Sequence, residues 1–521
     1  MVVLARPIVD ARGDDDAIID ETGTHSWTTF DERANRCLHA LRALGHADGS
    51  TVALLAGNRH ELFEVNAAVN HGGIVSPPLN WHLAPDEIAY ILENSGASAL
   101  VADAAFADLA MAAADRVDAV RDVIVFGTGE HALPTGALSY EDLLAAADPS
   151  EPADQSIGSI MMYTSGTTGR PKGVQSSALP LGAPMDVLKA VLDGYSTLLS
   201  VPVEGRVLIN APLYHGGPYL FGIIPFSLGN TAVVQQRFDA AEMLRTIDEH
   251  GITTAYCVPT HFVRLLRAPE AVREAFDGSS LQCVYHTAAP CPPVVKRQML
   301  EWWGPVIYEL YAATDAGVGT VITPQEWLAK PGSVGQAVPV SEILIVGDDG
   351  ERLGPNEVGT IYVKSLLGAE LSYLGDPDKT AAAHLDSTTV TVGDVGYLDD
   401  DGYLYLSDRK IDMIISGGVN IYPAEIEAHL ITHPAVADVG VFGVPDDEFG
   451  EQVKAAVLLN DGFEAGPALE DELVAFCREG LAGFKVPRSF DFPKDFPRTP
   501  TGKLEKRKLR DPYWEGRDRA I

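Results

Sequence analysis

Residues 163–173 combine hydroxyl groups, glycines and cations at a spacing that suits a bound polyphosphate. Glycine lets the backbone turn its N–H groups toward anionic oxygens at little steric cost. The hydroxyls add neutral donors, and the lysine adds a point charge. The residues concerned are Thr164, Ser165, Gly166, Thr167, Thr168, Gly169, Lys172 and Gly173. The apolar stretch before them, residues 157–162, predicts a buried strand that delivers the loop at its end, as in nucleotide-binding α/β sheets.

Two other interpretations of this segment are weaker. Clusters of Ser, Thr and Gly are usually flexible surface loops, but a linker has no reason to combine a preceding strand with this spacing of glycine and lysine. A Walker phosphate loop requires Gly-Lys-Ser/Thr, so that the hydroxyl after the lysine can bind magnesium. Here Arg170 and Pro171 separate Gly169 from Lys172, and Gly173 follows. The spacing therefore argues against a Walker loop.

Together with five further segments, this loop resembles the acyl-adenylate-forming superfamily, which includes acyl-CoA synthetases, luciferases and the adenylation domains of peptide synthetases. The further segments are Tyr-Ala-Ala-Thr-Asp at 311–315, Gly-Asp-Val-Gly-Tyr at 393–397, Ser-Asp-Arg-Lys at 407–410, residues 416–427, and Pro-Thr-Gly-Lys at 500–503. They follow the family's order and span almost the whole chain. The resemblance implies an α/β fold with a large N-terminal domain, residues 1–408, and a small mobile C-terminal domain, residues 409–521.

The resemblance implies a reaction in two steps. A carboxylate attacks the α-phosphorus of ATP, giving acyl-AMP and pyrophosphate, and a thiol then attacks the acyl carbon. The first step brings two anions together, so it depends on electrostatic stabilisation and orientation. In the family, the residue matching Lys503 bridges the acyl carboxylate and the α-phosphate. The implied catalytic residues are Thr164, Lys172, His215, Thr314, Asp315 and Lys503, with Mg²⁺ held by Thr164 and Asp315.

The resemblance also implies contacts for adenosine and for coenzyme A. Asp394 would accept hydrogen bonds from both ribose hydroxyls, because a carboxylate has two acceptor oxygens. Arg409 would contact the ribose or phosphate, and Tyr311 would stack on the adenine. The other implied ATP contacts are Ala288, Ala289, Pro290, Glu309, Leu310, Ala312 and Thr314, and the loop entered by coenzyme A contains Gly417, Gly418 and Asn420.

Three positions depart from the family pattern. Asp315 stands where the motif has glutamate. Magnesium needs short bonds of about 2.0–2.1 Å, so the shorter side chain would reach the ion through water. Ala312 replaces a glycine, which costs roughly 1–2 kcal/mol only if the backbone there is left-handed. Ile411 occupies a hinge position where relatives often carry Asp or Lys, so domain rotation is expected but its control is undefined.

The acyl pocket is expected beside residues 212–217, where His215 would guard the entrance for the carboxylate. The other predicted pocket residues are Gly216, Gly217, Tyr219, Val258, Thr260, His261, Tyr285, His286, Thr287, Ala288 and Ala313. This set contains no acidic residue to pair with a substrate amine, which favours an uncharged, apolar acyl group. Small residues at 288, 312, 313 and 317 would leave room for a long or polycyclic acid.

Free coenzyme A is the expected thiol, and the basic residues at 503–510 would suit its phosphates. Transfer to the phosphopantetheine of a carrier protein is the first alternative, and an enzyme specialised for adenylation alone is the second. An ATPase or kinase of the Walker type would release ADP instead of AMP and pyrophosphate. A pure nucleotide-binding module would bind ATP without converting it to either set of products.

Composition limits the partners and the location. The formal net charge of −35 opposes nucleic acid and anionic membranes, because the long-range field repels polyanions. The longest apolar region, Tyr219–Leu228, is broken by Gly222 and Pro225 and does not predict an integral membrane segment. Charged residues from Asp10 onward come too early for a secretory signal, so a cytoplasmic protein is expected, with a homodimer left open. The five cysteines show no metal-ligand spacing and are expected to be reduced core residues.

The elements that must position these residues follow from hydrophobic periodicity. A chain of 521 residues is too long for one core. Residues 26–150 alternate amphipathic helices with short apolar strands, such as Phe30–Leu44 and Thr51–Ala56, and similar alternation recurs at 207–234 and 253–284. We therefore expect a large α/β body with parallel strands. Short strands and Gly/Asp turns at 343–405 predict a β-rich subdomain, and the segment after residue 409 predicts a compact unit of helices and strands.

Overall fold

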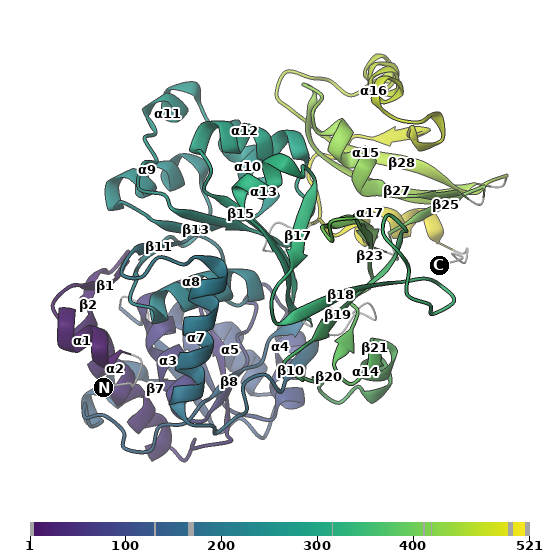
Figure 1. The fold of residues 1–521 in the computed structure, drawn as a ribbon. Coiled ribbons are helices and arrows are strands. Elements are labelled where there is room, and N and C mark those ends of the chain that lie inside the picture. Colours follow the sequence, from purple (N-terminus) through teal and green to yellow (C-terminus); the bar gives the residue numbers. More distant parts are fainter. Residues whose placement is uncertain are drawn as a thin grey trace.

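The computed structural model describes residues 5–129, 132–164, 171–314, 316–409, 412–417, 419–446, 448–498 and 504–515, with only the backbone of residues 408 and 409. It has a large N-terminal domain of sheets and helices and a small C-terminal domain, which is drawn in yellow-green in Figure 1. The predicted fold class is therefore confirmed. None of the described helices combines the length and apolar character needed to cross a bilayer.

The first sheet is parallel throughout, as predicted. Its strands, in spatial order, are β7 (Leu138–Ser139), β6 (Asp122–Phe126), β5 (Ala97–Asp103), β3 (Thr51–Leu55), β4 (Val75–Ser76) and β8 (Ser159–Ile160). The helices between them in sequence are α3 (His60–His71), α4 (Pro85–Ser95), α5 (Ala107–Ala114) and α6 (Tyr140–Ala146), with α2 (Trp27–Ala43) before β3. Every residue of β3 is buried, as expected for a parallel strand covered on both faces. The strand predicted at 157–162 is shorter than expected and comprises only β8.

The second sheet begins with a parallel half that carries most of the site. Its strands, in spatial order, are β2 (Gly23–Ser26), β1 (Asp16–Asp20), β12 (Thr231–Val234), β11 (Arg206–Ile209), β13 (Thr254–Cys257), β14 (Cys283–His286) and β15 (Ile307–Ala313), with only β2 antiparallel to its neighbour. The accompanying helices are α1 (Arg6–Arg12), α7 (Met185–Leu199), α8 (Gly216–Ser227), α9 (Ala240–His250), α10 (Pro259–Leu266), α11 (Glu270–Ala275) and α12 (Pro293–Trp303). The apolar region at 219–228 lies mostly in α8, which packs in the protein core.

Beyond β15 the sheet becomes antiparallel, which confirms the β-rich subdomain. Its strands are β16 (Gly317–Ile322), β17 (Ser333–Ala337), β24 (Leu404–Arg409), β23 (Asp394–Leu398), β19 (Gly359–Ser365), β22 (Thr389–Val390) and β21 (His384–Asp386), with β18 (Ser341–Val346) also paired to β19. Two short helices, α13 (Pro324–Ala329) and α14 (Pro377–Ala382), interrupt them. A separate small sheet joins β20 (Leu371–Tyr373), β10 (Lys172–Ser176) and β9 (Tyr163–Thr164).

The C-terminal part has its own sheet and hydrophobic core. The strands are β26 (Val419–Ile421), β25 (Ile414–Ser416), β28 (Gly450–Leu459), β27 (Val436–Asp446) and β29 (Ser489–Asp491), and the helices are α15 (Pro423–Leu430), α16 (Pro467–Gly480) and α17 (Lys506–Arg510). The Arg267 guanidinium, just after α10, donates hydrogen bonds to the carbonyls of Val436 at 2.7 Å and Ala437 at 2.6 Å. These bonds join the two parts in this structure. The boundary after residue 408 stays a prediction, because residues 410 and 411 lie outside the described ranges.

Candidate active site

The predicted site residues gather where neighbouring parallel strands end. Strands β11, β13, β14 and β15 lie side by side in this order. Their carboxyl ends lead into residues 210–217, 258–261, 287–290 and 314, respectively. Ligands of open α/β sheets bind outside this edge. The structure therefore brings together four segments that are far apart in the sequence.

The strands on either side of the predicted phosphate loop form a hairpin. Thr164 of β9 pairs in register with Lys172 of β10, and the predicted ligands at 165–169 lie outside the described residues. The Lys172 ammonium lies 4.7 Å from the centre of the Tyr373 ring, which orients it by a cation–π contact. The expectation that Gly173 serves backbone bending is corrected, since its φ is not positive. A Cβ at Gly173 would come within 3.0 Å of Cζ of Tyr163, so this glycine permits close packing.

The predicted adenosine contacts are linked to each other through the sheet. The Tyr311 hydroxyl donates to Oδ2 of Asp394 at 2.9 Å, which joins the end of β15 to the start of β23. Asp394 is also opposite Arg409 in the register of β23 and β24, although the Arg409 side chain lies outside the described part. Ala312 is not left-handed, so its replacement of the motif glycine carries no backbone strain. The hydroxyl of Tyr311 thus holds the predicted ribose acceptor in place.

The segment after β14 has an unusual backbone. Ala288 has φ of +76°, a left-handed conformation that is unfavourable for a residue with a Cβ. Ala288, Ala289 and Pro290 are all exposed at the edge of the sheet. The exposed, tightly turned backbone suits close approach of a flat ligand such as a purine base.

Replacing Ala288 by glycine is expected to stabilise the protein. Glycine adopts a left-handed φ without the Cβ clash, so the free energy of unfolding should rise by about 0.5–1 kcal/mol. A higher urea midpoint would report the gain. Ala289→Gly is the matched control, since Ala289 has no positive φ and should gain nothing. A lower midpoint for Ala288→Gly would contradict the strain at this position.

The predicted carboxylate entrance joins two motifs in space. His215 precedes α8, and burial lowers the pKa of its imidazole to about 4, so the ring is neutral at pH 7. Its Nε2 atom is buried and has no hydrogen-bond partner among the described residues. A Cβ at Gly216 would come within 3.0 Å of Oγ1 of Thr314, and a Cβ at Gly217 within 2.6 Å of the Tyr256 hydroxyl. The two glycines therefore let α8 begin very close to β13 and to the 311–315 motif.

A cavity of about 220 Å³ opens beside this entrance. Its walls are Trp81, His82, Asn210, Ala211, Pro212, Pro218, Gln236, Arg237, Phe238, Tyr256, Val258 and His261. The predicted residues Val258 and His261 are among them, and His261 stacks on Phe238 with ring centres 3.8 Å apart. Burial lowers the pKa of His261 to about 3, so this ring is also neutral. Sequence reasoning missed Trp81 and His82, which lie in the segment between β4 and α4. In the sequence, only the adjacent Trp-His pair marks them.

Two predicted pocket residues have their hydroxyls engaged elsewhere. Tyr219 faces α3, where its hydroxyl accepts hydrogen bonds from Asn66 at 2.6 Å and Asn70 at 3.4 Å. Tyr285 is fully buried, and its hydroxyl donates to the Leu199 carbonyl at 2.6 Å. Both are corrected from pocket walls to packing residues, because helix and strand directions point them into the core rather than toward the sheet edge.

A third and a fourth prediction, His286 and Glu309, fail because both side chains are buried and engaged by core residues. His286 follows Tyr285 on β14 and lies on the opposite face, packed against Phe262. Its Nε2 lies 3.4 Å from Oε2 of Glu309, which is also 2.6 Å from the Lys296 ammonium of α12. His286 is therefore not a pocket wall, and the Glu309 carboxylate is part of a buried ion pair instead of contacting a nucleotide. The other predicted residues Thr260, Thr287 and Ala313 lie at or next to the strand ends described above, whereas Leu310 is in the middle of β15 and is buried in the core.

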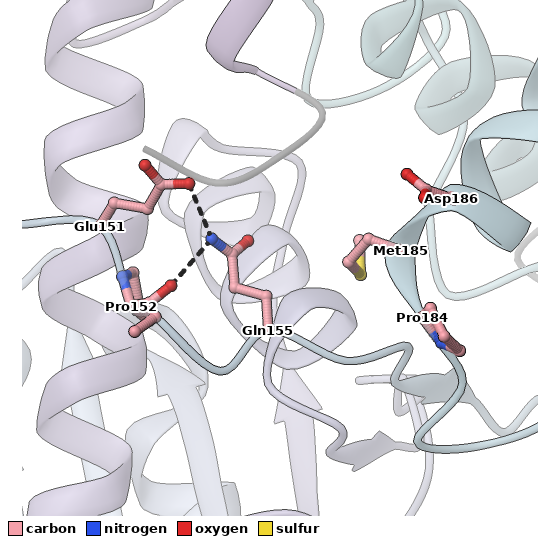
Figure 2. Close-up of a pocket in the computed structure, with 7 residues that line it drawn as sticks. Glu151, Pro152, Gln155, Pro184, Met185 and Asp186 are labelled. Carbon is pink, nitrogen blue, oxygen red and sulfur yellow. Dashed lines mark hydrogen bonds between the residues drawn. The ribbon is translucent and has the colours of Figure 1, made fainter.

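A larger surface hollow does not resemble a nucleotide site. It measures about 470 Å³ and lies between residues 151–155 and the start of α7 (Figure 2). Its lining has no cationic side chain, and Gln155 there donates to Oε1 of Glu151 at 3.3 Å and to the Pro152 carbonyl at 3.1 Å. An anionic nucleotide would meet Glu151 and Asp186 in this hollow, so its chemistry is unsuited to ATP.

The predicted coenzyme A loop is a tight hairpin turn. Gly417 has φ of +59° between β25 and β26, and its N–H donates to the Phe449 carbonyl at 2.8 Å. Asn420 is exposed on β26, and Gly418 lies outside the described residues, as does Lys503. The basic tail is not simply a charged surface for coenzyme A, because Lys506 pairs with Glu427 at 2.8 Å and Arg507 with Asp511 at 2.8 Å. These pairs fasten α17 and the tail.

Comparison with known proteins agrees with this geometry. The family model described as AMP-binding enzyme matches residues 7–370, and the AMP-binding enzyme C-terminal domain matches residues 425–503. The chain is similar to the long-chain-fatty-acid–CoA ligase FadD13 of Mycobacterium tuberculosis, with 33% identity over 94% of this chain and 93% of the relative. It is 31% identical to the fatty acid–[acyl-carrier-protein] ligase ScoC of Streptomyces coeruleorubidus, over 97% and 95% of the two chains. The fold also matches the anthranilate CoA ligase AuaEII in complex with anthranoyl-AMP, with a TM-score of 0.87, 25% identity and coverage of 98% and 96%.

Proposed function

Because the chain belongs to the AMP-binding enzyme family, we propose that it joins a carboxylic acid with a compact, uncharged acyl group to a thiol through an acyl-adenylate. The reaction class is AMP-forming ligation, in which ATP and the acid give acyl-AMP and pyrophosphate, and the thiol then displaces AMP. The observation that carries the proposal is the convergence of residues 212–217, 287–290 and 311–314 at one sheet edge.

In the first step, the charge of the phosphates must be screened while one carboxylate oxygen forms a bond to the α-phosphorus. We assign this screening to Lys172 and Lys503 and to the loop at 165–169. The hydroxyl of Thr164 and the carboxylate of Asp315 are oxygen ligands of the kind that Mg²⁺ prefers. Thr164 ends β9 and Thr314, beside Asp315, is exposed, so both positions are open to a ligand. Mg²⁺ would add positive charge beside the departing pyrophosphate.

A neutral His215 suits the entrance of a carboxylate. A charged imidazolium would pair with the incoming carboxylate and weaken it as a nucleophile, whereas a neutral ring donates only a hydrogen bond. The pKa of about 4 keeps the ring neutral at the pH where the acid itself is ionised. His215 would therefore orient the carboxylate without neutralising it.

The size and walls of the cavity favour a ring-bearing acyl group. Ligand pockets usually measure about 300–1,000 Å³, and the cavity here is about 220 Å³. Its walls include the aromatic rings of Trp81, Phe238 and Tyr256, which favour stacked or edge-on contacts with another ring. Asn210 and His261 each keep one buried polar atom without a partner among the described residues. A compact aromatic acid with a polar substituent would use these atoms better than a long alkyl chain.

The acceptor is proposed to be coenzyme A. The turn at Gly417 and the exposed Asn420 lie in the segment that resembles the entry of a pantetheine arm. The similarity to a ligase named for an acyl carrier protein makes carrier phosphopantetheine the second candidate. Both acceptors present the same pantetheine thiol, so the mass of the thioester product is what distinguishes them.

One assay tests the reaction and the acid together. The protein is incubated with ATP, Mg²⁺ and a panel of aromatic, polycyclic and long-chain acids, with and without coenzyme A or a phosphopantetheinyl carrier protein, and products are identified by mass. Acid-dependent AMP and pyrophosphate are expected, with a higher kcat/KM for one-ring or two-ring acids than for a chain of about sixteen carbons, which is too long for a cavity of about 220 Å³. Release of ADP would exclude the reaction class. Preference for the long chain would contradict only the acyl assignment.

A further inference from the structure

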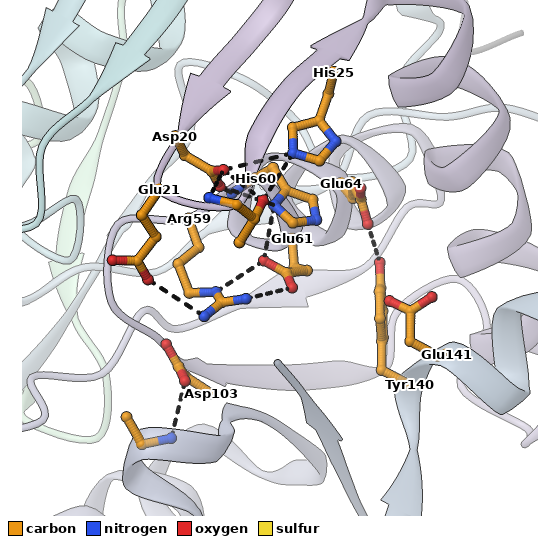
Figure 3. Close-up of polar contacts among 12 residues, drawn as sticks. Asp20, Glu21, His25, Arg59, His60, Glu61, Glu64, Asp103, Tyr140 and Glu141 are labelled. Atoms are coloured by element: carbon orange, nitrogen blue, oxygen red, sulfur yellow. Dashed lines mark hydrogen bonds and ion pairs between the residues drawn. The ribbon is translucent and has the colours of Figure 1, made fainter. Parts of the chain in front are cut away.

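The N-terminal hairpin and the start of α3 bring Asp20, His25 and His60 together as potential metal ligands (Figure 3), and Thr22 adds a hydroxyl. Asp20 ends β1, Thr22 lies in the turn, His25 lies on β2, and His60 is the first residue of α3. Strand β2 is the edge of the second sheet. The polar cluster thus connects the hairpin to the start of α3.

The donor atoms of the four side chains lie within hydrogen-bond or ion-pair distance of one another. Oγ1 of Thr22 lies 3.0 Å from Nε2 of His25 and 3.3 Å from Nδ1 of His60. The Asp20 carboxylate oxygens lie 2.6 Å from Oγ1 of Thr22, 3.5 Å from Nε2 of His25 and 2.8 Å from Nδ1 of His60. The ligand atoms of Asp20, His25 and His60 all lie within 4.8 Å of one another. Four ligands at zinc-type bond lengths of about 2.0–2.2 Å in a tetrahedron are about 3.3–3.6 Å apart, so an ion would widen the contacts of Asp20 at 2.6 Å and 2.8 Å.

The two imidazoles are stacked and both present a nitrogen to the same carboxylate. Their ring centres are 3.9 Å apart with an angle of 23° between the planes. The Asp20 side chain is 1% exposed and the His25 side chain 20% exposed, so the charge is buried while one ligand remains accessible.

The charges around the cluster favour a cation. Oε2 of Glu61 lies 3.3 Å from Nδ1 of His60, and Glu21 lies 3.6 Å from the Arg59 guanidinium on the same side. Arg59 forms two hydrogen bonds with Glu61, at 3.0 Å and 2.9 Å, so this one guanidinium faces the two carboxylates of Glu61 and Glu21. Asp20 additionally accepts the backbone N–H of His60 at 3.0 Å, which holds its carboxylate in place at the start of α3.

We propose that Asp20, Thr22, His25 and His60 bind one divalent transition-metal ion of the Zn²⁺ class. Two imidazoles and a carboxylate are ligands that suit zinc, and a hydroxyl or water completes four-coordination. The ion would fasten the edge hairpin to α3. We assign the ion a structural role, because none of the four residues is among the predicted nucleotide or acyl contacts.

Zinc titration of the full-length protein tests the site. Protein freed of metal by a chelator and kept without nucleotide is titrated with Zn²⁺ in a calorimeter, and bound metal is counted after gel filtration. One equivalent per chain is expected. His25→Gln should weaken binding by about 100-fold or more, because loss of a direct ligand should cost at least as much as loss of an outer-shell partner. His46→Gln is the matched control. His46 also pairs with an aspartate, Asp122 at 2.9 Å, but it lies outside the candidate metal site, so zinc affinity should not change.

The coordination itself is tested on the unaltered protein with Co²⁺. Four-coordinate Co²⁺ gives a strong visible absorption, which Zn²⁺ should abolish by displacement. The weak absorption of six-coordinate Co²⁺, or no stoichiometric uptake, would overturn the proposal. Equal zinc affinity in the unaltered protein and in a folded His25→Gln variant would overturn it as well, since the metal would then lie elsewhere.

Discussion

Replacing Lys503 by alanine is expected to lower the rate of acyl-AMP formation by about 10²–10³-fold, the loss typical of one group that stabilises charge in a transition state. The lysine would lie between two anions, the acyl carboxylate and the α-phosphate, where a flexible ammonium offsets their repulsion. The second step begins from a mixed anhydride that is already formed, so it no longer requires that bridge. Pyrophosphate release measures the first step, and thioester formation from supplied acyl-AMP measures the second.

Lys506→Ala is the matched control for this prediction. Lys506 is three positions further along the same tail and pairs with Glu427 at 2.8 Å. Loss of the Lys506 ammonium should change the rates of both half-reactions little. Any effect should appear first in the stability of the protein. An equal loss of both steps in Lys503→Ala would count against the bridging role. A slow first step in Lys506→Ala would show that the whole tail, rather than one lysine, is required.

Replacing Asp394 by alanine is expected to raise the KM for ATP by about 100-fold. Hydrogen bonds to a charged group contribute about 1.5–3 kcal/mol each, so loss of the acceptor for two ribose hydroxyls produces an effect of at least this size. The kcat at saturating ATP should change much less, because ribose contacts are present in the ground state and the transition state alike. Initial rates of pyrophosphate release across ATP concentrations separate the two parameters.

Tyr311→Phe removes the hydroxyl that donates to Asp394 at 2.9 Å while keeping the ring. We expect an intermediate rise in the KM for ATP, since the carboxylate remains but is less firmly oriented. Asp400→Ala is the matched control, because Asp400 is an exposed aspartate in the turn that joins β23 to β24. An unchanged KM in Asp394→Ala would remove this residue from the ribose site.

The prediction of the fold succeeded where the pattern is local. The apolar face of Phe30–Leu44 and the short run Thr51–Ala56 correspond to α2 and β3 within a few residues. The change to short strands at 343–405 corresponds to the antiparallel part of the second sheet. These elements depend on periodicity and turn residues within a few positions of each other, which a single sequence displays directly.

The prediction of the pocket was less accurate, because it required knowing which way each side chain points. Tyr285 and His286 are adjacent on β14, so they could not both face the ligand. Tyr219 lies on a helix that is apolar on most sides, where periodicity does not identify the face toward α3. Trp81 and His82 reach the cavity from the first sheet, and this depends on how two sheets pack together.

By itself, the sequence predicted a polyphosphate loop at 163–173, because glycines, hydroxyls and a lysine at that spacing are a local chemical property. The order of the other motifs added the rest of the reaction. Only the tertiary structure decided that Tyr311 holds Asp394, that Ala288 is strained, and that the cavity is small and aromatic. The physical reason is that hydrogen bonds, backbone angles and cavity walls arise from residues that become neighbours only after the strands are ordered in the sheet.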